Sequence, residues 1–178
     1  LNINLRNYDK ITKYCNELIK MNPNNYYSCG VLYNLSWNGE KAFNCFKESS
    51  ELTQYAHYYY NRGYAKYSLN NFQEAIEDYT KAIELKSDNE RYYYWRAIAK
   101  SCLKDTQGAL EDFNKAIELN PNVADFYEDR GVTNFRLKNY QESIEDDTKA
   151  IQLCPSAPQA YFNRGTTKLH LKNYQESI

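Results

Sequence analysis

The sequence predicts an all-α fold in which antiparallel helix hairpins repeat along the chain. The string LKNYQESI occurs at 137–144 and again at 171–178, an offset of 34 residues. The same offset links the Lys-Ala-Ile triplets at 81–83, 115–117 and 149–151. A fixed period of roughly 20 to 50 residues is typical of repeat architectures, in which each repeat is one supersecondary unit.

Two amphipathic helices can be traced in each repeat. In the unit at 90–123, Tyr93, Ala97 and Lys100 lie three or four residues apart, as one face of a helix requires. After a break, the same spacing resumes at Ala109, Leu110, Phe113, Ala116 and Ile117. Each repeat therefore reads as helix, turn, helix.

The period also sets the boundaries of the repeats within what we expect to be a single solenoid spanning 1–178. The pattern decays upstream, where residues 8–21 read as the second helix of an incomplete hairpin. The expected units are a partial repeat at 1–22, a degenerate repeat at 23–55, full repeats at 56–89, 90–123 and 124–157, and a truncated repeat at 158–178. Because the helical pattern includes residue 178, we expect the chain to be part of a longer protein.

Capping residues and prolines mark the expected helix ends. Short polar side chains that accept hydrogen bonds favour the N-cap position. The expected N-caps of the second helices are Asn71, Asp105, Asn139 and Asn173. Proline cannot continue a helix, and it follows the expected ends of second helices at Pro23, Pro121 and Pro155.

Small residues recur where the two helices of a hairpin would meet. In each unit one small residue precedes another by 12 positions, and the pairs are Gly63 and Ala75, Ala97 and Ala109, Gly131 and Ser143, and Gly165 and Ser177. Glycine inside a helix costs about 1 kcal/mol relative to alanine. Its repeated use at one position therefore indicates that two helix backbones approach closely there.

Together these features resemble the tetratricopeptide repeat family over nearly the whole chain. Further matching positions at the same period are Ala82, Ala116 and Ala150, aromatic Phe72, Tyr140 and Tyr174, and Pro121 and Pro155. The resemblance implies a right-handed superhelical solenoid of antiparallel helix hairpins. It also implies that the first helices line a concave groove, which binds a peptide or a helix of a partner protein.

One departure from the family pattern is an arginine in the first helix, where most family members have leucine. It recurs at Arg62, Arg96, Arg130 and Arg164. An acidic pair repeats in step in the second helix, at Glu77–Asp78, Glu111–Asp112 and Glu145–Asp146. We therefore predict an ion pair within each hairpin, and the alternative is a ladder of arginines that binds an acidic ligand.

A second departure is Asp147, which stands where the two preceding units have Tyr79 and Phe113. A charge at a core aromatic position is costly unless it is paired. We expect Asp147 to weaken its helix or to mark a local partner.

Composition and motifs argue against several classes of function. The chain has 22 Lys and Arg against 23 Asp and Glu, which does not favour binding to nucleic acid or to an anionic membrane. Phosphate loops, nucleophile motifs and metal-ligand spacings are not found, and His57 and His170 are isolated. We therefore predict that the chain is not an enzyme and has no catalytic residue, no metal and no cofactor.

The five cysteines have no pair spacing and are odd in number. We expect small buried thiols in a reducing compartment, which favours a cytoplasmic location.

Helical spacing assigns one stripe of each first helix to the predicted groove. The residues that we expect to contact a partner are Tyr60, Tyr64, Arg91, Tyr94, Trp95, Asp125, Glu128 and Asp129. Aromatic residues are frequent hot spots of binding, and the alternative is that several of them pack between neighbouring hairpins. One subclass of the family binds a chaperone's C-terminal carboxylate through Lys and Asn, and here Tyr60 and Tyr64 occupy those slots. We therefore predict no such carboxylate clamp.

The sequence thus favours a protein–protein interaction scaffold that binds a peptide or helix in its concave groove. The first alternative is a structural subunit packed permanently within a larger assembly. A third interpretation, RNA binding, is disfavoured because no basic face is predicted.

Overall fold

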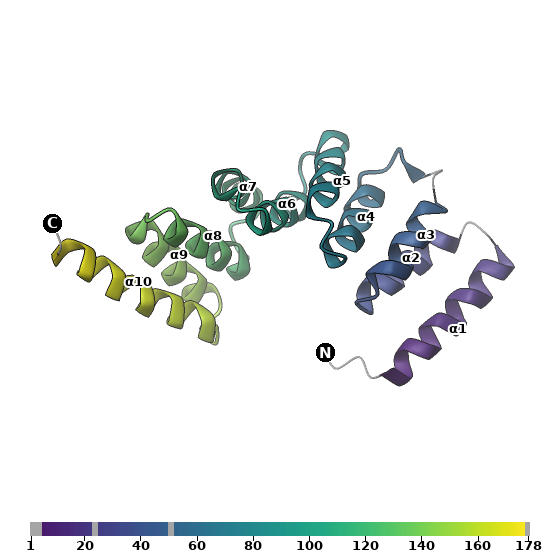
Figure 1. The fold of residues 1–178 in the computed structure, drawn as a ribbon, viewed down its shortest axis with the longest axis horizontal. Helices are drawn as coiled ribbons and strands as arrows, with labels where there is room; N and C mark the ends of the chain where they lie inside the picture. Colours follow the sequence, from purple (N-terminus) through teal and green to yellow (C-terminus); the bar gives the residue numbers. More distant parts are fainter. Residues whose placement is uncertain (1–4, 23–24, 50–51, 177–178) are drawn as a thin grey trace. The chain divides into compact units, whose positions relative to one another are not determined.

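The computed structural model describes residues 5–22, 25–49 and 52–176, with side chains from residue 10 to residue 172, and over these ranges it contains helices and no strands (Figure 1). The predicted all-α fold is confirmed. The helices are α1 (Leu5–Met21), α2 (Tyr26–Leu35), α3 (Gly39–Lys47), α4 (Ala56–Ser68), α5 (Phe72–Leu85), α6 (Glu90–Cys102), α7 (Thr106–Leu119), α8 (Ala124–Arg136), α9 (Tyr140–Leu153) and α10 (Pro158–Glu176).

The chain divides into two compact units, Leu1–Ser87 with α1 to α5 and Asp88–Ile178 with α6 to α10. In the first unit α2 pairs with α3 and α4 pairs with α5, while α1 packs on α2. In the second unit α6 pairs with α7 and α8 pairs with α9, and α10 packs on α9. The predicted repeat boundaries and the single solenoid remain predictions.

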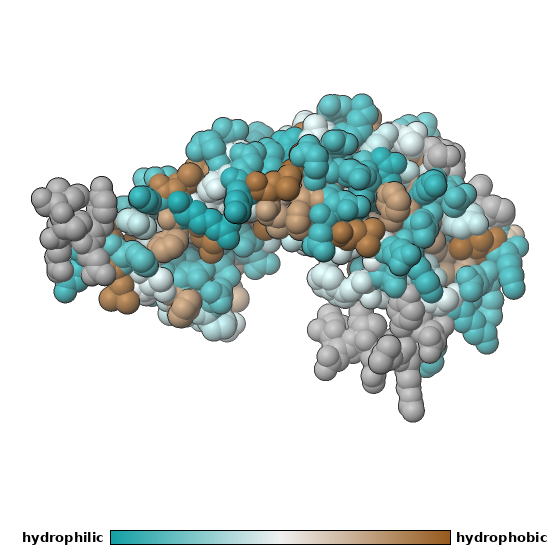
Figure 2. Space-filling model, in the orientation of Figure 1, coloured by the Kyte–Doolittle hydropathy of each residue, from teal (hydrophilic) through white to brown (hydrophobic). Residues whose placement is uncertain are grey.

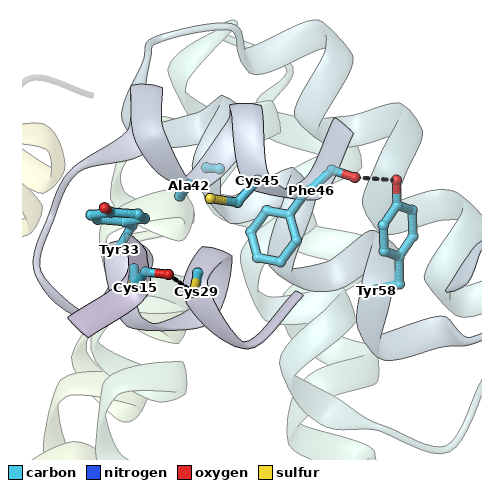
Figure 3. Packing of buried hydrophobic residues seen from close by; sticks show 8 residues of the cluster. Cys15, Cys29, Tyr33, Ala42, Cys45, Phe46 and Tyr58 are labelled. Carbon is cyan, nitrogen blue, oxygen red and sulfur yellow. Dashed lines mark hydrogen bonds between the residues drawn. The ribbon is translucent and has the colours of Figure 1, made fainter. Parts of the chain in front are cut away.

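The core of the first unit joins α1, the hairpin α2/α3 and α4 (Figure 3). Cys15, Cys29 and Phe46 are fully buried in it. The Tyr58 hydroxyl of α4 donates a hydrogen bond of 3.0 Å to the carbonyl oxygen of Phe46 in α3. The side chain of one hairpin thereby satisfies a backbone group of the hairpin before it.

The cysteines differ in burial according to their position in the chain. Cys15, Cys29 and Cys45 are buried as predicted, and burial raises the pKa of Cys29 to about 12 and that of Cys45 to about 11. The prediction of a buried thiol is wrong for Cys102, which is exposed because it is the last residue of α6 and lies beside a turn, and Cys154 is only half-buried.

In the second unit the helices of each hairpin meet across small residues. Ala97 of α6 and Ala109 of α7 are fully buried against Phe113. In the next hairpin Tyr127 packs near Ala150, together with Ala160 of α10. Ala97 and Ala109 hold the positions at which the sequence predicts close helix approach.

Each first helix of the later hairpins is followed, two positions after its last residue, by a residue in the left-handed conformation, at Asn70, Lys104 and Lys138. The turn after α6 shows the pattern: the amide of Lys104 donates to the carbonyl of Ser101, and the amide of Asp105 donates to that of Lys100. These two bonds form a Schellman motif, which satisfies carbonyls that the helix end leaves unpaired. The motif sets the start of the second helix.

The expected N-caps have different outcomes. Asp105 caps α7, because its Oδ1 accepts a hydrogen bond from the Gly108 amide at 3.0 Å. Asn71 and Asn139 stand at the N-cap positions of α5 and α9, without a side-chain cap bond. The prediction for Asn173 is wrong, because α10 continues through it to Glu176. Pro23 and Ser177 lie outside the described residues.

Close approach at the recurring glycine is confirmed where the second helix is present. A Cβ on Gly63 would lie 2.9 Å from Cε1 of the buried Tyr79 ring. A Cβ on Gly131 would lie 3.2 Å from Oδ1 of Asp147 and 3.4 Å from the backbone oxygen of Ser143. Glycine therefore makes room for the second helix at both positions.

Candidate functional site

An ion pair joins the two helices of each complete hairpin. Arg62 donates from Nε to Oδ2 of Asp78 at 2.8 Å and from Nη2 to Oδ1 at 2.6 Å. Arg96 donates to Asp112 in the same way, at 2.9 Å and 2.6 Å. The aspartate side chains are only 5% and 6% exposed, so these are buried acceptors. The ion pair predicted from the repeating residues is confirmed.

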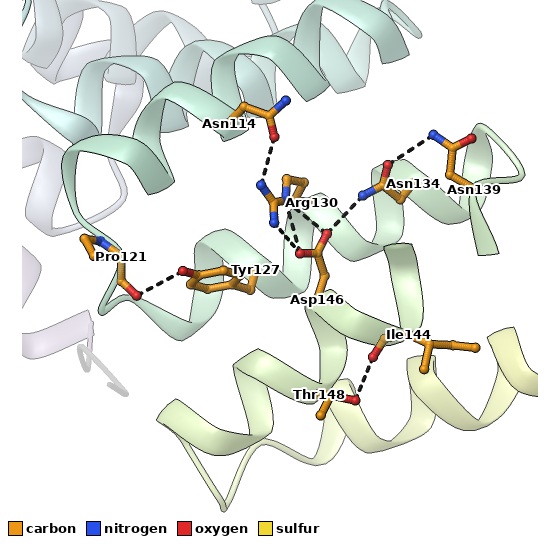
Figure 4. Close-up of polar contacts among 9 residues, drawn as sticks. All are labelled: Asn114, Pro121, Tyr127, Arg130, Asn134, Asn139, Ile144, Asp146 and Thr148. Atoms are coloured by element: carbon orange, nitrogen blue, oxygen red, sulfur yellow. Dashed lines mark hydrogen bonds and ion pairs between the residues drawn. The ribbon is translucent and has the colours of Figure 1, made fainter. Parts of the chain in front are cut away.

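The third ion pair also reaches the preceding hairpin (Figure 4). Arg130 of α8 donates from Nη2 to Oδ1 of Asp146 in α9 at 2.5 Å, and from Nη1 to Oδ1 of Asn114 in α7 at 2.9 Å. Asn134 donates from Nδ2 to the other carboxylate oxygen of Asp146 at 3.0 Å. One guanidinium group therefore links three helices.

The arginines also lie over aromatic rings of their own helices, as Arg62 does over the Tyr59 ring at 5.3 Å. The pKa of Arg62 is raised above its ordinary value, chiefly by the hydrogen bonds to Asp78. A second cation, Lys66, lies 3.2 Å from the same carboxylate. Because these groups interact with one another, an arginine ladder that binds an acidic ligand is disfavoured.

In the first unit the two tyrosines predicted for the groove are half-buried. The ring of Tyr60 lies 6.1 Å from that of Tyr79, and the ring of Tyr64 lies 6.2 Å from that of Trp37. Burial raises the pKa of Tyr64. Both tyrosines thus contribute to packing as well as to the surface.

In the second unit Tyr94 is mainly a packing residue. Its ring lies 4.8 Å from that of Phe126 and 6.0 Å from that of Phe113. Its hydroxyl donates a hydrogen bond of 2.7 Å to Oδ2 of Asp129. The adjacent Trp95 is half-buried, with its ring 5.7 Å from that of Tyr94. These contacts bring α6 and α8 side by side.

The remaining predicted residues are charged. Arg91 and Asp125 are exposed, whereas Glu128 and Asp129 are half-buried. Burial raises the pKa of Glu128, and the charges of Asp129 and Asp125 raise it further. Burial also raises the pKa of Asp129, against the effect of the Tyr94 hydrogen bond. The structure therefore brings the three acidic residues of α8 into one electrostatic cluster.

Two hollows lie along the face that α6, α8 and α10 share. The hollow between α6 and α8 has a volume of about 210 Å³ and the hollow between α8 and α10 has one of about 120 Å³. Val132 lines both of them, one helical turn after Glu128. Asp129 lines the first, and Phe135 and Phe162 line the second. The acidic cluster is thus next to surface hollows.

Asp147 is the feature whose role the sequence left unexplained. Its side chain is fully buried and, among the described residues, neither carboxylate oxygen has a hydrogen-bond partner. Its pKa is raised to about 7, first by burial and then by the charges of Asp146 and Glu128, with Arg164 acting in the opposite direction. Sequence reasoning singled out Asp147 and Glu128 separately but did not connect them. The 34-residue register could have connected them, because Glu128 and Asp147 stand where the preceding hairpin has Tyr94 and Phe113.

The part of the chain that the structure describes offers no cluster of three or more His, Cys, Asp and Glu side chains suited to a metal ion. No helix within the described ranges is long and apolar enough to cross a membrane.

Comparisons with known proteins identify the class. A family model described as "Tetratricopeptide repeat" matches residues 56–89, and a second model with that description matches 103–158. The two matches cover about half of the chain. A comparison with curated protein sequences gave no match.

Solved structures of other proteins share this fold. MamA is 22% identical, with a TM-score of 0.74 over 83% of this chain and 88% of that chain. YrrB, described as a TPR protein with an unusual peptide-binding site, is 20% identical, with a TM-score of 0.74 over 92% of this chain and 87% of that one. The first TPR domain of Spaghetti (RPAP3), bound to the HSP90 peptide SRMEEVD, is 27% identical, with a TM-score of 0.65 over 67% of this chain and 95% of that chain.

The fold and the helix-lined face define an all-α repeat protein of the kind that mediates protein interactions, typically without enzymatic activity. The chain belongs to the tetratricopeptide repeat family.

Proposed function

We propose that the chain is an interaction scaffold that binds a peptide or helix of a partner protein on the face lined by α6, α8 and α10. The observation that carries this proposal is the pair of hollows that meet at Val132. Such hollows accept individual side chains of a peptide, with polar residues close by to orient it.

The similarity to the RPAP3 domain supports a peptide as the ligand, since that domain is bound to the HSP90 peptide SRMEEVD. The partner of this chain has a different chemistry. An acidic peptide end would be repelled by Asp125, Glu128 and Asp129.

The polarity of one face of the molecule favours a reversible contact over an obligate one. On the face shown in Figure 2, described apolar side chains lie in small groups among hydrophilic ones. Obligate interfaces are larger and more apolar than this.

Two exposed apolar side chains of the first unit favour the second candidate, a permanent place in a larger assembly. Leu35 is 66% exposed and Trp37 is 71% exposed, close together in sequence at the turn after α2.

A selection of random 12-residue display peptides on the whole chain tests the proposal. The variant Val132→Trp fills both hollows, and Gln107→Trp on the exposed side of α7 is the matched control. Circular dichroism establishes that both variants keep their helix content. We expect selected peptides to bind at least about tenfold more weakly to Val132→Trp and unchanged to Gln107→Trp. Equal binding to both variants would place the site elsewhere.

A further inference from the structure

The third hairpin replaces an aromatic contact with two carboxyl groups. In the first two complete hairpins, the rings at this pair of positions are Tyr60 with Tyr79 and Tyr94 with Phe113, with centroids 6.1 Å and 6.0 Å apart. In the third hairpin the same register places Glu128 of α8 and Asp147 of α9 together. Two like charges replace one apolar contact, and this is unfavourable without a compensating group.

The Asp147 carboxylate points toward α8. Its Oδ1 would lie 3.2 Å from a Cβ on Gly131, which is one turn along α8 from Glu128. The side chain is fully buried, and both of its oxygens lack a hydrogen-bond partner among the described residues. This unpaired buried carboxylate, close to the charges of Asp146 and Glu128, distinguishes the place from an ordinary acidic surface.

The nearby cations do not neutralise this cluster. Arg130 donates to Asp146 and Asn114, and Arg164 donates to Thr148 at 3.2 Å. Asp129 has its own compensation, because it accepts from the Tyr94 hydroxyl and the charge of Arg136 acts to lower its pKa. Among the described residues, neither Glu128 nor Asp147 forms an ion pair, and a proton or a cation from outside the chain would neutralise their charge.

We propose that Glu128 and Asp147 form a subsite for a lysine or arginine side chain of the bound peptide, with the cation held by Glu128 over the buried Asp147. The subsite rests on the proposed function, since it names the partner's chemistry at the same face. The hollow beside Val132 and Phe162 would receive an apolar side chain near that basic residue. The partner is thus a peptide in which a basic residue and an apolar residue are close together.

Binding of a cation at the subsite is expected to release a proton. A cation bound over the cluster favours ionised Asp147, so binding releases a proton when this group is protonated in the free chain. The groups that face it are Asp146 on its own helix, Glu128 on α8 and Arg164 on α10. Because the pKa of Asp147 in the free chain is about 7, we expect binding up to about tenfold weaker at pH 6 than at pH 8.

The test uses the random 12-residue peptide library on the whole chain at pH 8. Two variants remove the charges: Glu128→Gln/Asp147→Asn keeps the side-chain sizes, and Glu128→Tyr/Asp147→Phe restores the residue types of the preceding hairpin. Circular dichroism verifies the fold of each. We expect peptides enriched in Lys or Arg near an apolar residue on the original chain, and loss of that enrichment on both variants. The synthetic consensus peptide is then titrated at pH 6 and pH 8.

The outcomes separate the two proposals. Peptides selected without a basic preference, or with the same preference on the charge-free variants, would overturn the basic subsite and leave the peptide-binding proposal standing. Selection of no peptide at all would contradict both. Titration with CaCl₂ and MgCl₂ is a further check, because saturable metal binding that the variants abolish would assign the cluster to a metal instead.

Discussion

The guanidinium group of Arg96 and the carboxylate of Asp112 lie in register across the hairpin α6/α7, joined by hydrogen bonds of 2.9 Å and 2.6 Å. Arg96→Leu removes both of these hydrogen bonds and leaves Asp112 with Lys100, whose Nζ lies 2.8 Å from Oδ2, so we expect the free energy of unfolding to fall by about 2 kcal/mol. A double-mutant cycle with Asp112→Ala, followed by thermal unfolding, measures the coupling between them. Additive effects of the two substitutions would contradict a specific pair.

An exposed ion pair is the control for this cycle. Lys115 and Glu118 of α7 lie 2.7 Å apart on the surface. Surface pairs contribute little, so Lys115→Leu should leave the melting temperature nearly unchanged.

The hydroxyl of Tyr79 is buried and has no hydrogen-bond partner among the described residues. An unsatisfied buried hydroxyl is costly, and we expect Tyr79→Phe to raise the free energy of unfolding by about 1 kcal/mol. Tyr58→Phe is the matched control, because it loses the bond to the Phe46 carbonyl and should destabilise the chain. Urea unfolding of the two variants compares them, and equal effects would contradict the assignment.

Gly30 and Gly165 predict opposite results for the same substitution. A Cβ on Gly30 would lie 2.8 Å from two atoms of the buried Phe46 ring, whereas no atom of the described residues lies within 4 Å of a Cβ on Gly165. We expect Gly30→Ala to destabilise the chain by about 1–3 kcal/mol through overpacking. Gly165→Ala should stabilise it by up to about 1 kcal/mol through helix propensity. Calorimetry of both variants measures the difference, and the same sign for both would refute this explanation.

Asp147 predicts a pH dependence of stability. Its pKa in the folded chain is raised from the ordinary 3.8 to about 7 by burial and by Asp146 and Glu128, with Arg164 opposing. The folded state therefore binds the proton more tightly, and the stability from this group is lost as the pH rises through 7. We expect the free energy of unfolding to rise as the pH falls from 8 to 5, by at most about 1.4 kcal/mol per pH unit.

The control for this prediction is Asp147→Asn, which has no charge to lose. Its stability should change less with pH over the same range, as followed by thermal melts in matched buffers. If the free energy of unfolding of the wild-type chain does not change between pH 5 and 8, ionisation of Asp147 does not destabilise the folded state.

The helices and the ion pairs could be predicted because both are periodic. The spacing of apolar residues defines the face of each helix, and Arg96 and Asp112 recur in step with their equivalents in the other units. Two residues that repeat at a constant sequence separation occupy the same relative positions in every hairpin. The sequence alone was therefore sufficient to predict that they form an ion pair.

The irregular features could not be predicted in this way. Lys104 and Lys138 adopt a left-handed conformation that lysine seldom adopts, so their residue type gives no signal. The continuation of α10 through Asn173 shows that the capping preference of asparagine does not by itself end a helix. The exposure of the Tyr60 and Tyr94 rings likewise depends on tertiary packing, because part of each ring contacts a neighbouring ring and the rest lies at the surface.

The arginine that joins α8 to α9 also donates to Asn114 of α7, and Arg164 repeats the arrangement with Thr148 of α9. Loss of one hairpin therefore removes a bond from the hairpin next to it. In repeat proteins such nearest-neighbour terms determine how far unfolding spreads. The hairpins of the second unit should accordingly melt cooperatively, as a block, and their amides should exchange with solvent at similar rates.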